Sequence, residues 1–246
     1  MWLGVPGEEI VEKKIYQGDM NGRFAYYRLE VELGETGEAK VDICANSRYR
    51  MWINERPVLS GPCRSDQNRQ YYETVDVGSF FHVGKNVIAV QVLLCDSMYT
   101  PNCFDKRAPL VSVETLPAGH RLGLEGAVKN ETGEVMADLT TGEADWRVWL
   151  DNTFYVYKEG NVDGGLGALS EKIDFNQTFT DWKKDGFDAS SWKAAVKLEP
   201  VGEGPEMMFG ILKTFRMEER PIPLCFEEPA TLKRSWASRS LVMENI

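Results

Sequence analysis

The sequence predicts an all-β protein built as a sandwich of two packed sheets. Short runs in which apolar and polar residues alternate recur along most of the chain, the pattern of a strand with one buried face. Glycine, asparagine and proline residues separate these runs, as turns between strands require. The long amphipathic pattern of a helical barrel is not present. Many short strands with frequent turns are typical of a β-sandwich.

The first long strand is expected at residues 24–33, after a short lead that contains Trp2. Every second side chain of this run is large and apolar: Tyr27, Leu29, Val31 and Leu33. The intervening positions carry Tyr26, Arg28, Glu30 and Glu32. This alternation predicts an antiparallel strand with one face in the core and the other in solvent.

Residues 41–94 are the most regular part of the sequence. The segment 54–57 interrupts the alternation and predicts a turn, because asparagine tolerates positive φ and proline fixes its own φ. The Asp76 carboxylate is placed to cap one helical turn over 77–81. A second turn at 84–86 leads into an almost continuously apolar run, which predicts a central strand covered on both faces. Four strands are expected here, because the alternation that begins at Val41 continues through Tyr49 and Met51 to Ile53, and further runs lie at 58–59, 71–75 and 87–94.

The second half of the chain continues as β structure. Alternating runs on either side of residues 129–133 predict a hairpin over 122–139. Asp188 is placed to cap one helical turn and to direct Trp192 inward, as a plug at one end of the sandwich. A long polar loop is expected at 96–107, and such loops often bind ligands. Further strands are expected at 110–116, 146–150, 154–157, 173–179, 197–201 and 209–217.

Composition argues against several classes of function. The 246 residues carry a formal net charge of −10, which disfavours a phosphate-binding surface and so nucleic acid as a partner. No apolar run is long enough to cross a bilayer, and the first residues lack a secretory signal, so the compartment of any longer parent stays open. The five cysteines form no CxxC pair, which disfavours zinc and favours buried thiols. His82 and His120 lie next to turn glycines and are expected to be exposed.

The order of motifs along the chain resembles a known family. The motifs are Tyr49–Asn54, Gly61–Pro62, Tyr72 with Asp76–Val77, and Gly84–Val90, with Trp2 before them and Gly186–Trp192 after them. This order resembles the galactose-binding-like jelly roll at the front of many bacterial glycoside hydrolases, and it is most similar to the N-terminal domain of the α-L-rhamnosidase family. Glu55 stands where the family usually has glycine, which changes the expected turn type but not the strand pairing.

The resemblance implies a jelly-roll β-sandwich, galactose-binding-domain-like, with additional β-hairpins. Residues 1–225 would form this domain, as two sub-layers at 1–116 and 117–225, and residues 226–246 would be a linker towards a catalytic domain outside this chain. The chain would be a non-catalytic accessory domain that scaffolds the catalytic domain of the same polypeptide, with carbohydrate as an optional ligand. Three alternatives stay open: a free-standing carbohydrate-binding module, a domain that is itself a hydrolase, and a protein-interaction β-sandwich.

The residues themselves select no catalytic pair. Glycoside hydrolysis needs two facing carboxylates, and no spacing singles out a pair among 38 acidic residues. Sugar binding fits better, because aromatic rings stack on a pyranose while acids and amides take its hydroxyl groups. The candidate carbohydrate-binding residues are Tyr99, Asp96, Asn102, Asp105, Trp182 and Tyr155. No cofactor is expected, although oxygen-rich loop positions leave a structural calcium as an option: Asp66, Asn68, Asp151, Asn152, Asn161 and Asp163.

Overall fold

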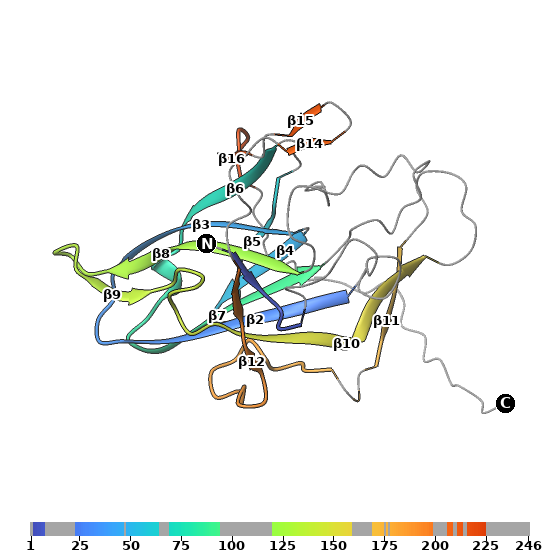
Figure 1. The fold of residues 1–246 in the computed structure, drawn as a ribbon. Helices are drawn as coiled ribbons and strands as arrows, with labels where there is room; N and C mark the ends of the chain where they lie inside the picture. The colour runs from blue at the N-terminus through green and yellow to red at the C-terminus, as the bar shows by residue number, and fades with distance from the viewer. Residues whose placement is uncertain are drawn as a thin grey trace, which may run out of the picture.

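The protein is a sandwich of two sheets (Figure 1). The computed structural model describes residues 2–7, 23–46, 48–63, 69–93, 120–158, 169–174, 176, 178–198, 206–208, 211–213 and 216–224. Within these residues two seven-stranded sheets are formed, together with one short 3-10 turn, η1 (Gly78–Phe80). No helix in the described part of the chain is long and apolar enough to span a membrane.

The first sheet has the order β13-β1-β8-β3-β6-β16, with β9 paired to β8. Its strands are β1 (Trp2–Gly4), β3 (Glu38–Asn46), β6 (Arg69–Asp76), β8 (Arg121–Lys129), β9 (Val135–Asp138), β13 (Val196–Leu198) and β16 (Arg216–Glu219). All of its pairings are antiparallel except that of β16, which runs parallel to β6 at the edge of the sheet.

The second sheet has the order β11-β10-β2-β7-β4-β5, with β12 paired to β10. Its strands are β2 (Arg23–Leu33), β4 (Arg48–Ile53), β5 (Arg56–Gly61), β7 (Gly84–Leu93), β10 (Arg147–Lys158), β11 (Leu169–Ile173) and β12 (Lys193–Ala194). A separate two-stranded sheet pairs β14 (Glu206–Met208) with β15 (Ile211–Lys213).

The chain crosses repeatedly between the two sheets, and this builds one core. Strands β2, β4, β5, β7 and β10 lie in the second sheet, whereas β3, β6, β8 and β9 lie in the first. The predicted all-β sandwich is therefore confirmed. The sub-layers expected at 1–116 and 117–225 do not coincide with the sheets, because β8 pairs with β3 and β10 pairs with β2.

The core lies between the inner faces of the two sheets and follows the predicted alternation. Tyr27 and Leu29 of β2 face Val41 and Ile43 of β3 within one buried apolar cluster. The hairpin of β8 and β9 turns at 130–134, where the Asn130 Oδ1 accepts the backbone N–H of Glu134 at 2.9 Å. The Asp76 Oδ1 accepts the Gly78 N–H at 3.0 Å at the start of η1, as expected.

The outer face of β2 is covered, which corrects the expectation of a solvent face. Arg28 is almost fully buried, and its guanidinium donates to the Trp182 carbonyl at 2.7 Å and to the Lys184 carbonyl at 3.0 Å. The same guanidinium is paired with the Glu30 carboxylate and lies 5.6 Å from the centre of the Phe187 ring. These bonds tie the segment 178–192 to the second sheet.

Aromatic rings fill the space under that segment. Trp182 stacks on Tyr26 with ring centres 4.6 Å apart, and Phe179 meets Trp149 edge to face at 4.6 Å. Trp192 is buried in the same cluster, and the Asp188 Oδ1 accepts the Ser190 N–H at 2.9 Å in the turn before it. Trp192 therefore points inward as expected, but the segment covers the outer face of the second sheet rather than one end of the sandwich.

Three further details differ from the sequence prediction. His120 is buried, because its ring nitrogen lies 2.9 Å from the Arg23 carbonyl and its own carbonyl accepts the Tyr27 hydroxyl. The strand expected at 173–179 ends at Ile173, after which the Asp174 Oδ1 accepts the Asn176 N–H in a turn. The strands expected at 146–150 and 154–157 are one strand, β10, with a shift of register between Asp151 and Tyr155. The strand expected at 110–116 lies outside the described residues.

The turn between β4 and β5 keeps a left-handed backbone at both of its central residues. Asn54 has φ of 50° and Glu55 has φ of 63°, the conformation of a hairpin turn that favours glycine at its second position. The Asn54 side chain is locked by bonds to the Val87 N–H at 2.9 Å and the Phe80 carbonyl at 3.0 Å. The expected change of turn type is not seen, so Glu55 holds a strained backbone.

We expect the substitution Arg28→Ala to lower the free energy of unfolding by about 3 kcal/mol, because the buried Trp182 carbonyl and the part-buried Lys184 carbonyl lose their donor. Urea unfolding would measure this. Arg48→Ala, at an exposed position of β4, is the matched control and should change stability by less than about 0.5 kcal/mol. Equal effects of the two substitutions would contradict the anchoring role of Arg28.

Glu55→Gly should raise the free energy of unfolding by about 0.5–1 kcal/mol, because the strain of a left-handed residue exceeds the added entropy of an unfolded glycine. Thermal or urea unfolding would show the gain. Glu55→Ala keeps the strain and should show no gain, so an equal gain with alanine would point to the side chain instead.

Candidate functional site

The structure separates the carbohydrate-binding residues expected from the sequence. Tyr99, Asp96, Asn102 and Asp105 lie outside the described residues. The backbone of Tyr155 is in β10, opposite Arg23, and its side chain is outside the description. Trp182 is 5% exposed and stacked on Tyr26, so its ring offers little surface to a ligand in this conformation.

The oxygen-rich positions considered for calcium are also divided. Asp66, Asn68, Asn161 and Asp163 lie outside the described residues. The Asp151 carboxylate is buried, and it accepts the Tyr26 hydroxyl at 2.7 Å and the Thr153 N–H at 2.7 Å. The Asn152 Oδ1 accepts the Arg23 guanidinium at 2.6 Å. Burial and the charge of Asp151 raise the pKa of Tyr26 well above its usual range. No group of three or more possible ligand side chains in the described ranges is placed to hold a metal ion.

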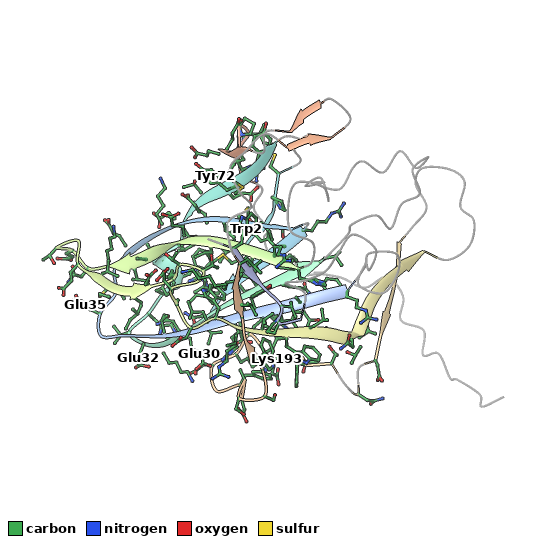
Figure 2. All side chains as sticks on the ribbon, in the orientation of Figure 1. Trp2, Glu30, Glu32, Glu35, Tyr72 and Lys193 are labelled. Carbon is green, nitrogen blue, oxygen red and sulfur yellow. The ribbon has the colours of Figure 1, made fainter. Side chains whose placement is uncertain are left out.

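The outer face of the first sheet carries an open hollow of about 360 Å³, which we call the aromatic hollow. Figure 2 places Trp2 and Tyr72 on the side of this sheet, with Glu30 and Lys193 on the side of the other. Half-buried aromatic rings, a partly exposed thioether, a buried thiol and two carboxylates line the hollow: Trp2, Tyr72, Met217, Cys44, Asp42 and Glu125.

Strand register arranges these side chains in rows across the sheet. Gly123 of β8 pairs with Cys44 on one side and with Trp2 on the other, and a Cβ added to Gly123 would lie 3.4 Å from the Trp2 ring. Asp42 lies one step further along β3, on the same face, between Thr74 and Glu125. The row that contains Trp2, Gly123 and Cys44, which we call the aromatic row, is therefore about 7 Å from the row that contains Asp42 and Glu125, which we call the carboxylate row.

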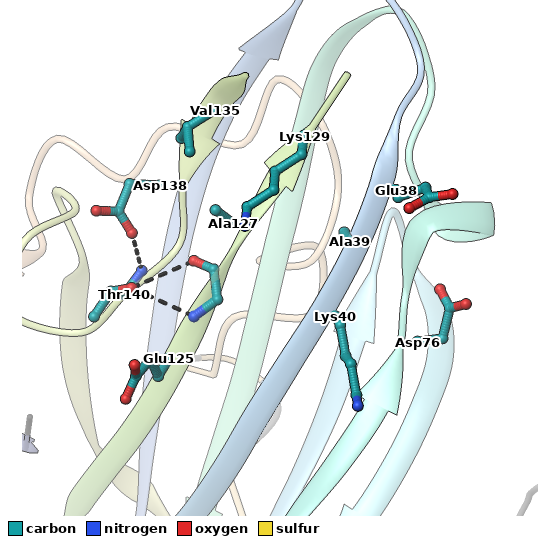
Figure 3. A pocket seen from close by; sticks show the side chains of 11 residues that line it. Glu38, Ala39, Lys40, Asp76, Glu125, Ala127, Lys129, Val135, Asp138 and Thr140 are labelled. Carbon is teal, nitrogen blue, oxygen red and sulfur yellow. Dashed lines mark hydrogen bonds between the residues drawn. The ribbon is translucent and has the colours of Figure 1, made fainter. Parts of the chain in front are cut away.

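A second, larger hollow of about 710 Å³ continues along the same face, and we call it the charged groove (Figure 3). It shares Glu125 with the aromatic hollow, so the two are adjacent. In its wall the Asp138 Oδ1 accepts the Thr140 N–H at 2.8 Å, and the Thr140 hydroxyl lies 3.3 Å from both the N–H and the carbonyl of Gly126. Further charged residues line it: Glu38, Lys40, Asp76 and Lys129.

A buried carboxylate supports the β6 and β16 side of the aromatic hollow. Glu73 points into the sandwich from β6, where one oxygen accepts the Tyr49 hydroxyl at 2.7 Å and the other accepts the Cys63 N–H at 2.6 Å. The Arg220 guanidinium lies 3.4 Å from the Glu73 Oε1, and the backbone N–H of Arg220 donates to the Tyr72 carbonyl at 3.0 Å. These contacts follow β16, the strand that carries Met217.

Burial raises the pKa of Glu73 above its ordinary value of 4.5, against the opposing effects of the Tyr49 hydroxyl, the Cys63 amide and the Arg220 charge. Burial also raises the pKa of the Cys44 thiol, and the charge of Glu73 adds to that increase. Both groups therefore resist ionisation inside the fold.

Sequence reasoning missed this site because its residues come from five strands. Trp2, Asp42, Tyr72, Glu125 and Met217 lie far apart in the sequence, and only the register of β1, β3, β6, β8 and β16 brings them together. The signal in the sequence was the alternation of Asp42 and Cys44 with Val41 and Ile43, which places the two pairs on opposite faces of a strand. The alternation of side chains shows which face of a strand a residue lies on, but it does not show which strands are neighbours in the sheet.

Three solved α-L-rhamnosidases share this fold over part of their length. The GH78 family rhamnosidase of Bacillus sp. GL1 matches with a TM-score of 0.59 at 22% identity, over 91% of this chain and 20% of that enzyme. The enzyme of Dictyoglumus thermophilum matches with a TM-score of 0.52 at 21% identity, over 73% of this chain and 18% of that enzyme. The enzyme of Aspergillus terreus matches with a TM-score of 0.55 at 19% identity, over 74% of this chain and 20% of that enzyme.

At these identities the comparison shows a shared fold. It confirms in three dimensions the likeness to α-L-rhamnosidases that the order of motifs indicated. The chain spans about a fifth of the length of the enzymes that it matches. No known protein family matches the sequence, and no curated protein does.

The pKa of Glu73 predicts a pH dependence of stability. Because the folded-state pKa is raised, the stability that the protonated acid contributes is complete below about pH 4.5 and is lost as the pH rises through the raised value. The unfolding free energy of the native protein relative to Glu73→Gln should therefore fall as the pH is raised from 4.5.

Urea unfolding of both proteins over a series of pH values would measure this difference. Hydrogen bonds altered by the substitution change the difference in unfolding free energy by the same amount at every pH. The raised pKa of Glu73 instead makes this difference vary with pH. A difference that does not vary with pH would contradict the raised pKa.

Proposed function

We propose that this chain is a non-catalytic accessory domain of an α-L-rhamnosidase-like glycoside hydrolase, with the galactose-binding-like jelly-roll form of the sandwich. The observation that carries the proposal is how much of each chain the structural match includes. It includes 73–91% of this chain but only 18–20% of each of three rhamnosidases. The remaining four-fifths of each enzyme is long enough to hold a separate catalytic domain. The role of this chain is to scaffold such a catalytic domain.

The chemistry of the described acidic residues supports a non-catalytic role. An acid catalyst of glycoside hydrolysis has a raised pKa and reaches the glycosidic oxygen. Glu73 has a raised pKa, but it is fully buried between the sheets and bound to Tyr49. It is not placed to protonate a sugar.

Exposed apolar side chains in and just after β16 support a scaffolding contact. Met217 in β16 is 40% exposed, and Ile222 and Leu224, just beyond that strand, are 54% and 37% exposed. Apolar side chains exposed in this way favour contact with another protein surface over water. The same group would serve a protein-interaction β-sandwich, which stays an alternative.

A second candidate is a free-standing carbohydrate-binding module, and the aromatic hollow is the observation that favours it. Its half-buried Trp2 and Tyr72 rings and its carboxylates are the kinds of group that bind sugars. The two candidates differ in whether the domain needs a catalytic partner.

The purified 246-residue chain should not release the aryl group from an aryl α-L-rhamnoside, because the bond-breaking groups belong to another part of the parent. A chromogenic assay with long incubation would test this, with an intact α-L-rhamnosidase as the positive control. Turnover by the chain that is retained through purification and lost in Asp42→Asn or Glu125→Gln variants would overturn the proposal.

A further inference from the structure

We propose that the aromatic hollow is a carbohydrate-binding site that takes a neutral pyranose or 6-deoxypyranose unit. This inference rests on the proposed function for the class of ligand. The position of the site and its selectivity for uncharged sugars come from the first sheet alone.

The first argument is that the half-buried aromatic rings on the outer face of the first sheet line an open hollow. On the second sheet, Tyr26 and Trp52 lie beneath the segment 178–192, whose Trp182 ring stacks on Tyr26 and whose Lys183 ammonium lies 4.5 Å from the centre of the Trp52 ring. On the first sheet, Trp2 and Tyr72 are half-buried and line a hollow. The half-buried rings on the other side, Trp149, Phe179 and Phe187, pack against one another and against Trp192. The open hollow of the first sheet is therefore the better place for a sugar ring to stack.

The second argument is the geometry of the rows. The apolar face of a pyranose stacks on an aromatic ring, and its hydroxyl groups project outward from the ring edge by a few ångströms. The carboxylates of Asp42 and Glu125 lie one side-chain step, about 7 Å, along their strands from the aromatic row. A ring bound against Trp2 would therefore turn one edge of hydroxyl groups towards carboxylate acceptors.

The third argument is that the floor of the site is preorganised. Cys44 is buried, Gly123 lies against the Trp2 ring, and both belong to the long antiparallel ladder of β3 and β8. The Thr74 hydroxyl donates to the Asp42 Oδ1 at 2.6 Å, which orients that carboxylate. Less side-chain entropy is then lost when a ligand binds.

Charge selects among sugars. Asp42 and Glu125 are neighbours across the ladder, so the aromatic hollow presents two carboxylates to its ligand. Hydroxyl donors are favoured there, whereas a uronic acid would place a third carboxylate beside them. The adjoining charged groove shares Glu125, so a second sugar unit would extend in that direction.

The experiment is an amide NMR titration of the full chain with methyl α-L-rhamnopyranoside, methyl β-D-glucopyranoside and methyl β-D-glucuronide. We expect a neutral glycoside to shift amides of β1, β3, β6 and β8 around Trp2, Asp42, Tyr72 and Gly123. The glucuronide should bind at least about tenfold more weakly than the neutral sugar of the same ring.

Substitutions then test the residues. Tyr72→Ala and Asp42→Asn should each weaken binding about tenfold, through the loss of an aromatic face and of a charged acceptor. Asp145→Asn, an exposed carboxylate outside both hollows, is the matched control and should leave binding unchanged. Because Trp2 belongs to β1, Trp2→Phe is used alongside Trp2→Ala, and amide spectra of the free variants report whether the fold is kept.

The outcomes separate this inference from the proposed function. Shifts confined to another surface, unchanged binding in the Tyr72 and Asp42 variants, or no shift with any of the three glycosides would overturn the site. None of these results bears on the accessory role, which falls instead if the chain hydrolyses an aryl rhamnoside. A glucuronide that binds as tightly as the glucoside would overturn the selectivity for neutral sugars.

Discussion

The buried guanidinium of Arg28 ties a covering segment to one outer face of this sandwich. Arg28 stands on the outer face of β2, where alternation alone would leave it in water, yet its guanidinium binds the carbonyls of Trp182 and Lys184. Burying a guanidinium is costly unless its donors are used, and here two backbone acceptors and the Glu30 carboxylate use its Nη1 and Nη2 donors, while Nε is buried without a partner among the described residues. The covering segment is thus held by directional bonds as well as by apolar contact.

The two outer faces consequently have different roles. The covered face of the second sheet brings Trp149, Trp182 and Trp192 into one aromatic cluster and adds a second layer of apolar packing. The uncovered face of the first sheet retains half-buried rings beside polar rows. The same residue types therefore stabilise the fold on one side and form the candidate site on the other, and the difference is whether a segment lies over them.

Much of the fold could be predicted from the sequence, because strand alternation and turn residues are local signals. The strands between residues 24 and 94 and the hairpin around Asn130 were predicted within a few residues. Arg28 and His120 were assigned to solvent, since nothing local in the sequence shows that a distant segment or carbonyl meets them. The aromatic hollow was missed for the same reason: Trp2, Tyr72 and Met217 are joined by sheet register, and register between distant strands is a long-range property.

The low reactivity of the Cys44 thiol is a consequence of its position in the first sheet. It lies on the floor of the hollow, between neighbouring strands, and burial keeps it protonated and chemically quiet at ordinary pH. Its side chain is almost fully buried, so a thiol reagent reaches the sulfur slowly in the folded sandwich. The rate of alkylation at Cys44, read separately from that of the half-buried Cys63, therefore reports how tightly the strands pack around the floor of the hollow.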